Sequence, residues 1–227
     1  MPLTLVLLTS IGKPSQIRRL EDLIGFRRYP MECKVVVVGD SKCGKSALVH
    51  RFANDNFLTM YTPTDFERCS VDHLVGDYSV RLTIWDTSGA AAYDTVRPLC
   101  YKDARAFLLC FDLSSQMSLH NTLKKWLQEI RSHSEAPIIL CGCQSDTRDE
   151  VKHPVTYEQA TAVSRQMNAT GYVETSAKNE EGVTDVFELC ALAALGKSRF
   201  ASLVRRHAPH LKKHLRTHHQ HKTCTIM

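Results

Sequence analysis

The sequence predicts an α/β fold, with a mostly parallel sheet, one antiparallel edge hairpin and helices on both faces. Two patterns support this prediction. Short apolar runs rich in β-branched residues alternate with longer segments whose apolar residues recur at helical spacing. Two neighbouring segments instead alternate apolar and polar residues around Gly76 and Asp77, as hairpins do. A chain of 227 residues suffices for one such domain with terminal tails.

The first predicted strand is the run KVVVV at residues 34–38, which ends at Gly39 and precedes a helix at 44–55. The hairpin strands follow at 68–75 and 78–86. The remaining strands are expected at 105–113, 137–142 and 171–176. The remaining helices are expected at 119–133 after a Ser118 cap, at 156–167, and at 182–196 with Gly196 as the last residue.

The net charge of +5 is concentrated at one end of the chain. From residue 197 onward there are eight Lys and Arg and no acidic residue, which leaves 21 basic and 24 acidic residues elsewhere. This asymmetry argues against a nucleic-acid-binding body and predicts that the tail meets an anionic surface. We therefore expect an unordered N-terminal extension at 1–30, a domain at 31–196 and a basic, His-rich tail at 197–227.

The N-terminal extension contains the apolar run LTLVLL at residues 3–8. This run lacks a preceding basic region and is too short to span a bilayer. A cryptic targeting segment is the alternative interpretation. Met31 is an alternative start, because the folded pattern begins immediately after it.

Several of the nine cysteines lie inside apolar runs, as buried thiols do in a reducing, cytosolic setting. Cys141 and Cys143 lie two apart on a predicted strand, so their side chains share one face. No second ligand pair follows at zinc-site spacing, so the sequence favours core packing over metal binding for this pair.

Polar clusters fall where predicted strands end, which is where ligands bind in such sheets. The stretch GDSKCGKS, from Gly39 to Ser46, lies between a strand and a helix and has the spacing of a phosphate-binding loop. Its backbone N–H groups can wrap a diphosphate. Lys45 would reach the β- and γ-phosphates, and the Ser46 hydroxyl would ligate Mg²⁺. The alternative is an ordinary strand–loop–helix turn.

Three weaker clusters follow in order. In WDTSG, Asp86 can hold Mg²⁺ through water and the Gly89 N–H can reach a terminal phosphate. In CQSD, Asp146 can accept hydrogen bonds from guanine, although for this tetrapeptide alone a helix or turn cap is the better explanation. In TSAK, at residues 175–178, backbone groups can contact the guanine O6.

Together these clusters resemble the Ras-like small GTPases. YTPTDF, YDTVRPLCY and KKW resemble the Rho branch of that family, and the serines of GDSKCGKS and DTSG resemble its Rnd subgroup. The resemblance covers about residues 33–195. It implies a P-loop nucleotide-binding fold with a six-stranded sheet and five helices, and it implies GTP or GDP and Mg²⁺ as cofactors. It assigns Thr64 to the metal and γ-phosphate, and Phe57 to the edge of the base.

The predicted site comprises residues that bind nucleotide and residues that bind metal. The nucleotide-binding residues are Gly39, Ser41, Lys42, Cys43, Gly44, Lys45, Ser46, Ala47, Phe57, Thr64, Gly89, Gln144, Asp146, Ser176, Ala177 and Lys178. The metal ligands are Ser46, Thr64 and Asp86.

The sequence departs from the Rho pattern at several positions. The segment after Asp146 is too short for the helix that Rho proteins insert there. Gln144 stands at the lysine position of the guanine motif, so affinity can fall while guanine selectivity through Asp146 survives. Asp65 and Cys69 replace an apolar residue and a tyrosine in the effector loop, so effector choice does not transfer.

Hydrolysis in this fold needs a glutamine that orients the attacking water and room for an arginine finger. The glutamine position here is Ala90, and Ser41 adds a side chain where the finger would pack. No catalytic residue is therefore predicted, and we expect little or no intrinsic hydrolysis. Three interpretations remain open: a GTP-held signalling protein acting through effectors on the actin cytoskeleton and cell shape, a cycling GTPase with partner-assisted hydrolysis, and a pseudo-GTPase scaffold with weak nucleotide binding.

The chain ends in CTIM, a C-a-a-X sequence whose terminal methionine favours farnesylation of Cys224. One lipid chain anchors weakly, so the basic residues of the tail would supply the second signal. We expect a monomer at the cytoplasmic face of membranes, chiefly the plasma membrane, with a cytosolic pool. Effectors would bind residues 61–69, from Tyr61 to Cys69, and 90–101, from Ala90 to Tyr101.

Overall fold

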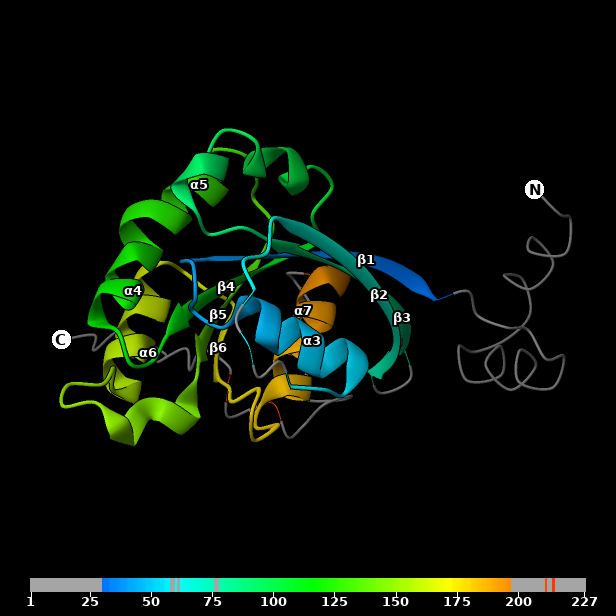
Figure 1. Cartoon of the computed structure of the whole chain (residues 1–227). Coiled ribbons are helices and arrows are strands. Elements are labelled where there is room, and N and C mark those ends of the chain that lie inside the picture. The colour runs from blue at the N-terminus through cyan, green and yellow to red at the C-terminus, as the bar shows by residue number, and fades with distance from the viewer. Residues whose placement is uncertain are drawn as a thin grey trace, which may run out of the picture. The chain divides into compact units, whose positions relative to one another are not determined.

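The computed structural model describes residues 30–57, 60, 62–75, 78–196, 211 and 214. Its centre is a six-stranded sheet in the order β2-β3-β1-β4-β5-β6 (Figure 1). The strands are β1 (Met31–Gly39), β2 (Phe66–Val75), β3 (Tyr78–Thr87), β4 (Ala106–Asp112), β5 (Ile138–Cys143) and β6 (Gly171–Glu174). Neighbouring strands are parallel except for the antiparallel β2–β3 pair, as predicted. The expected turn at Gly76 and Asp77 lies outside the described residues.

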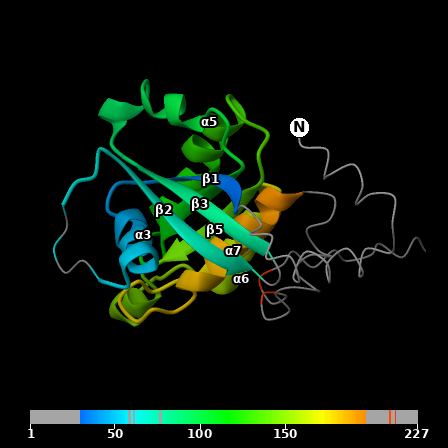
Figure 2. The same cartoon turned by 90° about the vertical axis from the view of Figure 1, so that its right-hand side faces the viewer.

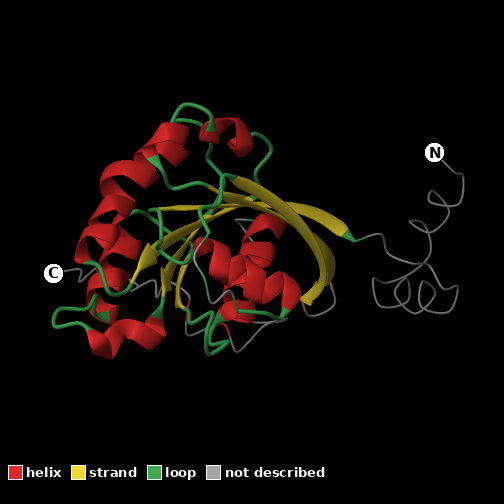
Figure 3. Cartoon of the chain, viewed as in Figure 1, coloured by secondary structure: helices red, strands yellow, loops and turns green. Residues whose placement is uncertain are grey.

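Five α-helical segments are described, two of which belong to the single helix expected at 119–133. They are α3 (Lys45–Asn54), α4 (Gln116–Asn121), α5 (Leu127–Arg131), α6 (Tyr157–Gln166) and α7 (Val183–Leu195). Short 3₁₀ turns are η1 (Ala91–Tyr93), η2 (Arg97–Tyr101) and η4 (Ser145–Glu150). Figures 1 and 3 show α3 and α7 on one side of the sheet and α4, α5 and α6 on the other.

Alternate residues of β1 supply the two halves of the core. Val35 and Val37 pack in the cluster that includes α3 and α7 residues. Val36 and Val38 pack in the cluster that includes residues of α5, α6 and the turn before α5. All four side chains are fully buried, because a central parallel strand is covered on both faces. Figure 2 shows the sheet from the side, with α5 and α3 on opposite faces.

The helix predicted at 119–133 begins earlier than expected, and Ser118 is not its cap. Ser115 is extended and its hydroxyl accepts a hydrogen bond from the Ser118 N–H at 3.2 Å, so α4 begins at Gln116. A π-helical turn at Thr122–Trp126 joins α4 to α5. This turn buries Trp126 completely. The periodic pattern located the helix but not its cap, because several serines precede it.

The predicted tail touches the domain at the two positions that the structure describes there. Leu211 is fully buried within the cluster that contains α7. His214 Nε2 lies 3.0 Å from Asp185 Oδ2. The sequence predicts neither contact. None of the described helices combines the length and apolar character needed to cross a bilayer.

Candidate nucleotide site

The loop between β1 and α3 curves around a cavity. Lys42 has a φ of 65° and Gly44 a φ of 104°, so the backbone turns through the left-handed region twice. A Cβ on Gly39 would lie 2.2 Å from the Cys110 carbonyl oxygen, so the loop leaves β1 closer to β4 than a side chain allows. Such a loop, opening a helix, directs N–H groups toward an anion.

The Lys45 ammonium lies inside this loop. Only 6% of the residue is exposed. Its Nζ donates to the carbonyl oxygens of Gly39 at 2.9 Å and Asp40 at 2.8 Å. A buried cation held by neutral carbonyls retains attraction for phosphate oxygens. This geometry fits the phosphate-binding role that the sequence predicts for Lys45.

The carboxylate of Asp40 ties the loop to the α4–α5 region. Trp126 Nε1 donates to Asp40 Oδ1 at 2.7 Å, and Asn121 Nδ2 donates to Oδ2 at 2.9 Å. Sequence reasoning singled out Trp126 only as part of KKW and missed this contact. The signal in the sequence was Asp40 itself, because an acidic residue inside a loop expected to bind phosphate needs a hydrogen-bond donor to compensate its charge.

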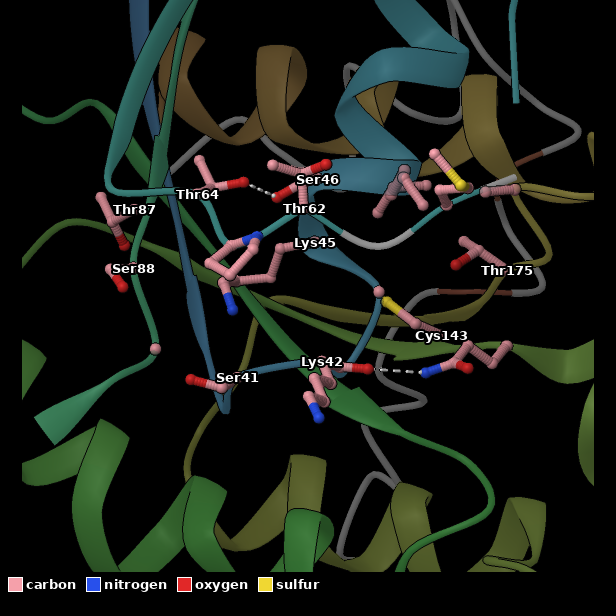
Figure 4. Close-up of a pocket in the computed structure, with 18 of the residues that line it drawn as sticks. Ser41, Lys42, Lys45, Ser46, Thr62, Thr64, Thr87, Ser88, Cys143 and Thr175 are labelled. Atoms are coloured by element: carbon pink, nitrogen blue, oxygen red, sulfur yellow. Dashed lines mark hydrogen bonds between the residues drawn. The ribbon is translucent and has the colours of Figure 1, made fainter. Parts of the chain in front are cut away.

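The residues predicted to bind metal converge at the start of α3. The hydroxyl oxygens of Ser46 and Thr64 lie 2.7 Å apart (Figure 4). Asp86 is 1% exposed, and neither of its carboxylate oxygens has a hydrogen-bond partner among the described residues. Burial raises the pKa of Asp86 to about 6, against the opposing influence of Ser46 and Lys45.

An unpartnered buried carboxylate beside two hydroxyls is costly unless a cation satisfies it. Carboxylate and hydroxyl oxygens are the hard donors that Mg²⁺ prefers. Ser46, Thr64 and Asp86 therefore fit a magnesium ion. Such an ion would neutralise phosphate charge beside Lys45.

At the other end of the cavity, Ser176 orients Asp146. The Ser176 hydroxyl donates to Asp146 Oδ1 at 2.6 Å, and Asp146 lines the cavity. Arg51 Nε donates to the Ala177 carbonyl at 2.8 Å and so ties α3 to this loop. Gln144 Nε2 donates to the Lys42 carbonyl at 3.1 Å. Gln144, whose side chain is shorter than the lysine of the guanine motif, thus links the base-binding and phosphate-binding loops.

The segment that carries Ala90 is held in place by the fully buried Arg97. The Arg97 guanidinium donates to the Ser88 carbonyl at 2.7 Å and to both carboxylate oxygens of Glu129 at 2.8 Å. Across the cavity, the Tyr93 hydroxyl donates to Asp65 and the Ser88 N–H donates to the Asp65 carbonyl at 2.9 Å. The segments around residues 65 and 90 are therefore fastened together.

These segments enclose one cavity of about 770 Å³. Most of the predicted residues line it: Ser41, Lys42, Gly44, Lys45, Ser46, Ala47, Phe57, Thr64, Gly89, Gln144, Asp146, Ala177 and Lys178. The other four predicted residues, Gly39, Cys43, Asp86 and Ser176, do not line it. Sequence reasoning did not assign the lining residues Leu48, Met60, Thr62, Pro63, Asp65, Thr87, Ser88, Tyr93, Cys143, Thr147 and Thr175 to the nucleotide site.

Comparisons with known proteins identify the family of this chain. Residues 34–195 match the model of the Ras family. The chain belongs to this family. It is 41% identical over 180 residues to human Rho-related GTP-binding protein RhoE, an alignment that covers 74% of each protein. It is 40% identical over 177 residues to GTP-binding protein rho1 of Schizosaccharomyces pombe, covering 73% of this chain and 88% of that protein.

A third relative gives the same result. GTP-binding protein RHO1 of Saccharomyces cerevisiae is 38% identical over 192 residues, covering 79% of this chain and 92% of that protein. This chain thus belongs to the Rho branch of the family, and the predicted resemblance to the Rnd subgroup is confirmed. Ras-like GTPases in general bind guanine nucleotide and Mg²⁺, which agrees with the arrangement of the cavity.

Proposed function

We propose that this Rho-family protein binds GTP with Mg²⁺ in the cavity and hydrolyses it far more slowly than a glutamine-bearing relative. It would then signal from a persistently GTP-bound state. The observation that carries this proposal is Ala90, which lines the phosphate end of a cavity otherwise equipped to hold a nucleotide.

Nucleotide retention is supported by complementary charges. Lys45 offers a buried ammonium to the phosphates, and Asp86 offers an unpartnered carboxylate to the magnesium ion. Asp146, oriented by Ser176, offers one carboxylate oxygen to the guanine edge. Lys45 and Asp146 are held by hydrogen bonds within the protein, so little ordering of these two groups is needed when GTP binds.

Slow hydrolysis is supported by the lack of a group that could orient water near the γ-phosphate. The Ala90 methyl group neither donates nor accepts a hydrogen bond. Among the described residues that line the cavity, Gln144 is the sole glutamine, and its amide is engaged at the base end by Lys42. The Tyr93 hydroxyl, which also lines the cavity, is engaged by Asp65.

A cycling GTPase and a weakly binding scaffold are the alternatives. The first requires a partner that supplies the missing water-orienting group. The second gained its plausibility from Gln144, because this side chain cannot cover the base as lysine does. The hydrogen bond from Gln144 to the Lys42 carbonyl weakens that argument, since the two loops are linked without lysine.

The nucleotide that copurifies with the protein discriminates among these functions. The full chain should be purified quickly with Mg²⁺, denatured, and its bound nucleotide identified by chromatography. We expect GTP in near-stoichiometric amount. Predominant GDP would favour the cycling enzyme, and an empty protein would favour the scaffold.

Effector binding is proposed at the two fastened segments, residues 62–69 and 90–101, with Tyr61 outside the described residues. Because Asp65 engages Tyr93, loss of the γ-phosphate would change both segments together. Through such effectors the protein would act on the actin cytoskeleton and cell shape, as the Rho resemblance implies. Affinity capture with the GTP-bound and GDP-bound forms tests this, and we expect effectors on the first only.

We further propose that residues 197–227 form a membrane-directing tail beyond the domain at 31–196, with 1–30 as a separate extension. Cys224 lies outside the described residues. Farnesylation there, together with eight Lys and Arg after residue 196, would hold the protein at the cytoplasmic face of membranes, chiefly the plasma membrane, beside a cytosolic pool.

Fractionation of cells that express the full chain tests the anchor. We expect Cys224→Ser to move the protein to the soluble fraction and Cys33→Ser, at a buried thiol in β1, to leave its distribution unchanged. Membrane binding of Cys224→Ser equal to that of the parent would show that lipidation is not the anchor.

A further inference from the structure

Three cysteine side chains meet in the core behind the base-binding end of the cavity. Cys110 belongs to β4, and Cys141 and Cys143 belong to β5. Cys110 and Cys141 are register partners on adjacent strands, so their side chains point to the same face of the sheet. Cys143 lies two residues further along that face. Parallel strand pairing therefore adds a third thiol to the C-x-C pair.

The three sulfur atoms are spaced for a shared ligand. The Cys141 and Cys143 sulfurs lie 3.7 Å apart, and all three lie within 4.8 Å of one another. A metal bound to three coplanar sulfurs at about 2.3 Å holds them about 4.0 Å apart. The three sulfur atoms would thus have to shift by less than an ångström to bind an ion between them.

The ligand set selects the type of ion. Thiolates favour soft cations such as Cu(I) and Zn²⁺. Structural zinc sites take four protein ligands, whereas this group, among the described residues, contains three cysteines and no histidine or carboxylate. A polar neighbour, Thr175 Oγ1, lies 3.4 Å from the Cys141 sulfur, and a neutral hydroxyl is a poor ligand for a soft ion. A three-sulfur set fits Cu(I).

The cluster has a path to solvent through the cavity. Cys143 lines the cavity wall beside the phosphate loop, where a Cβ on Gly44 would lie 3.0 Å from the Cys143 Cβ (Figure 4). An ion entering through the cavity therefore meets Cys143 first.

We propose that Cys110, Cys141 and Cys143 form a binding site for one Cu(I) ion beneath the nucleotide cavity. Binding displaces two thiol protons to water and leaves the third sulfur as a neutral donor. The bound group then carries one net negative charge. The alternative for these residues is apolar core packing, in which each thiol serves as a small hydrophobic group.

Competition for Cu(I) tests the site in the full-length reduced protein under anaerobic conditions. Cu(I) should be supplied as its bicinchoninate complex, and the bound metal examined by X-ray absorption. We expect one tightly bound ion with three sulfur neighbours at about 2.3 Å. Nitrogen-only coordination would assign the copper to the histidine-rich tail and overturn the proposal, as would failure to compete for copper.

Two matched variants distinguish the loss of a thiol in the proposed site from the loss of a buried thiol elsewhere. Cys141→Val removes a cluster sulfur, and Cys33→Val removes a buried sulfur from β1 that lies outside the cluster. Changes in outer-shell partners alone alter metal affinity roughly 10- to 100-fold, so loss of a ligand should weaken Cu(I) binding by at least about 100-fold. Equal affinity in the two folded variants would overturn the proposal. If Cys141→Val fails to fold, the number of sulfur neighbours that X-ray absorption finds around copper in the parent protein still tests the proposal.

Discussion

At the phosphate end of the cavity, Lys45 donates to two loop carbonyls and Asp86 lies buried without a partner, whereas at the adjoining corner Ala90 presents a methyl group. Both regions are rigidly supported. Asp40 fastens the phosphate loop to Trp126, and Arg97 fastens the Ala90 segment to Glu129. The corner near Ala90 therefore lacks a functional group rather than order.

This difference distinguishes the requirements for binding a nucleotide from those for hydrolysing it. Retention depends on charges that are present in the ground state, and in the proposed function Lys45 and Asp86 supply them. Hydrolysis needs an additional group that positions water only when the reaction occurs. A family member can thus lose the second property by changing one side chain while it keeps the first.

Removal of Lys45 should produce the largest effect. In Lys45→Ala the phosphates lose a buried charged donor, which typically costs about 2–5 kcal/mol, or roughly 30- to 5,000-fold in affinity. Bound nucleotide should disappear from the purified variant, and Ser46→Asn should reduce it by impairing Mg²⁺ binding. Lys152→Ala, at an exposed lysine, is the matched control. Full occupancy in folded Lys45→Ala would refute the phosphate-site assignment.

Restoring the missing group should sharpen the comparison. We expect Ala90→Gln combined with Ser41→Gly to raise single-turnover GTP hydrolysis by up to about 100-fold, because water positioning contributes on that scale. Each single change should do less. Ala92→Gln, at an exposed neighbouring alanine, should leave the rate unchanged. Rapid turnover by the parent domain would contradict the GTP-held interpretation.

The tie between Asp40 and Trp126 predicts an intermediate effect. Trp126→Phe keeps an aromatic ring but removes the indole donor, and loss of a hydrogen bond to a charged group costs about 1.5–3 kcal/mol. We expect a lower melting temperature and faster release of a fluorescent guanine nucleotide. Trp85→Phe, at a partly buried tryptophan of β3, should change release much less. Equal effects would mean that Asp40 does not position the loop.

The smallest effect is expected at Gln144. Gln144→Leu removes an exposed hydrogen bond to the Lys42 carbonyl, worth about 0.5–1.5 kcal/mol, so guanine nucleotide affinity should fall by up to about tenfold. Gln144→Lys should instead raise affinity, since its stem covers the base. Gln128→Leu on α5 serves as control. A Gln144→Leu variant with unchanged affinity would show that the link between the loops is dispensable.

The sequence predicted the sheet, most helices and the main site residues because their signals are local. The run ending at Gly39, the glycine-framed loop and the helix after it are continuous in the chain, so their motif located Lys45 and Ser46 directly. The Ser115 cap was missed because Ser114, Ser115 and Ser118 offer similar hydroxyls. The choice among them depends on the backbone at the end of β4.

Contacts between distant segments required the tertiary structure. Asp40 and Trp126 are 86 residues apart, and Lys42 and Gln144 are 102 apart. Each pair meets because the strand order brings β1, β4 and β5 side by side.

The sequence by itself determined the fold class, the family and the residue types that can hold a nucleotide, because strand and helix periodicities and short motifs are properties of neighbouring residues. The tertiary structure decided how the loops are fastened and which thiols meet. Cys110 joins Cys141 because parallel pairing sets them in register, and no spacing along the chain encodes that register. Residues that sequence order separates become one site only when the sheet assembles.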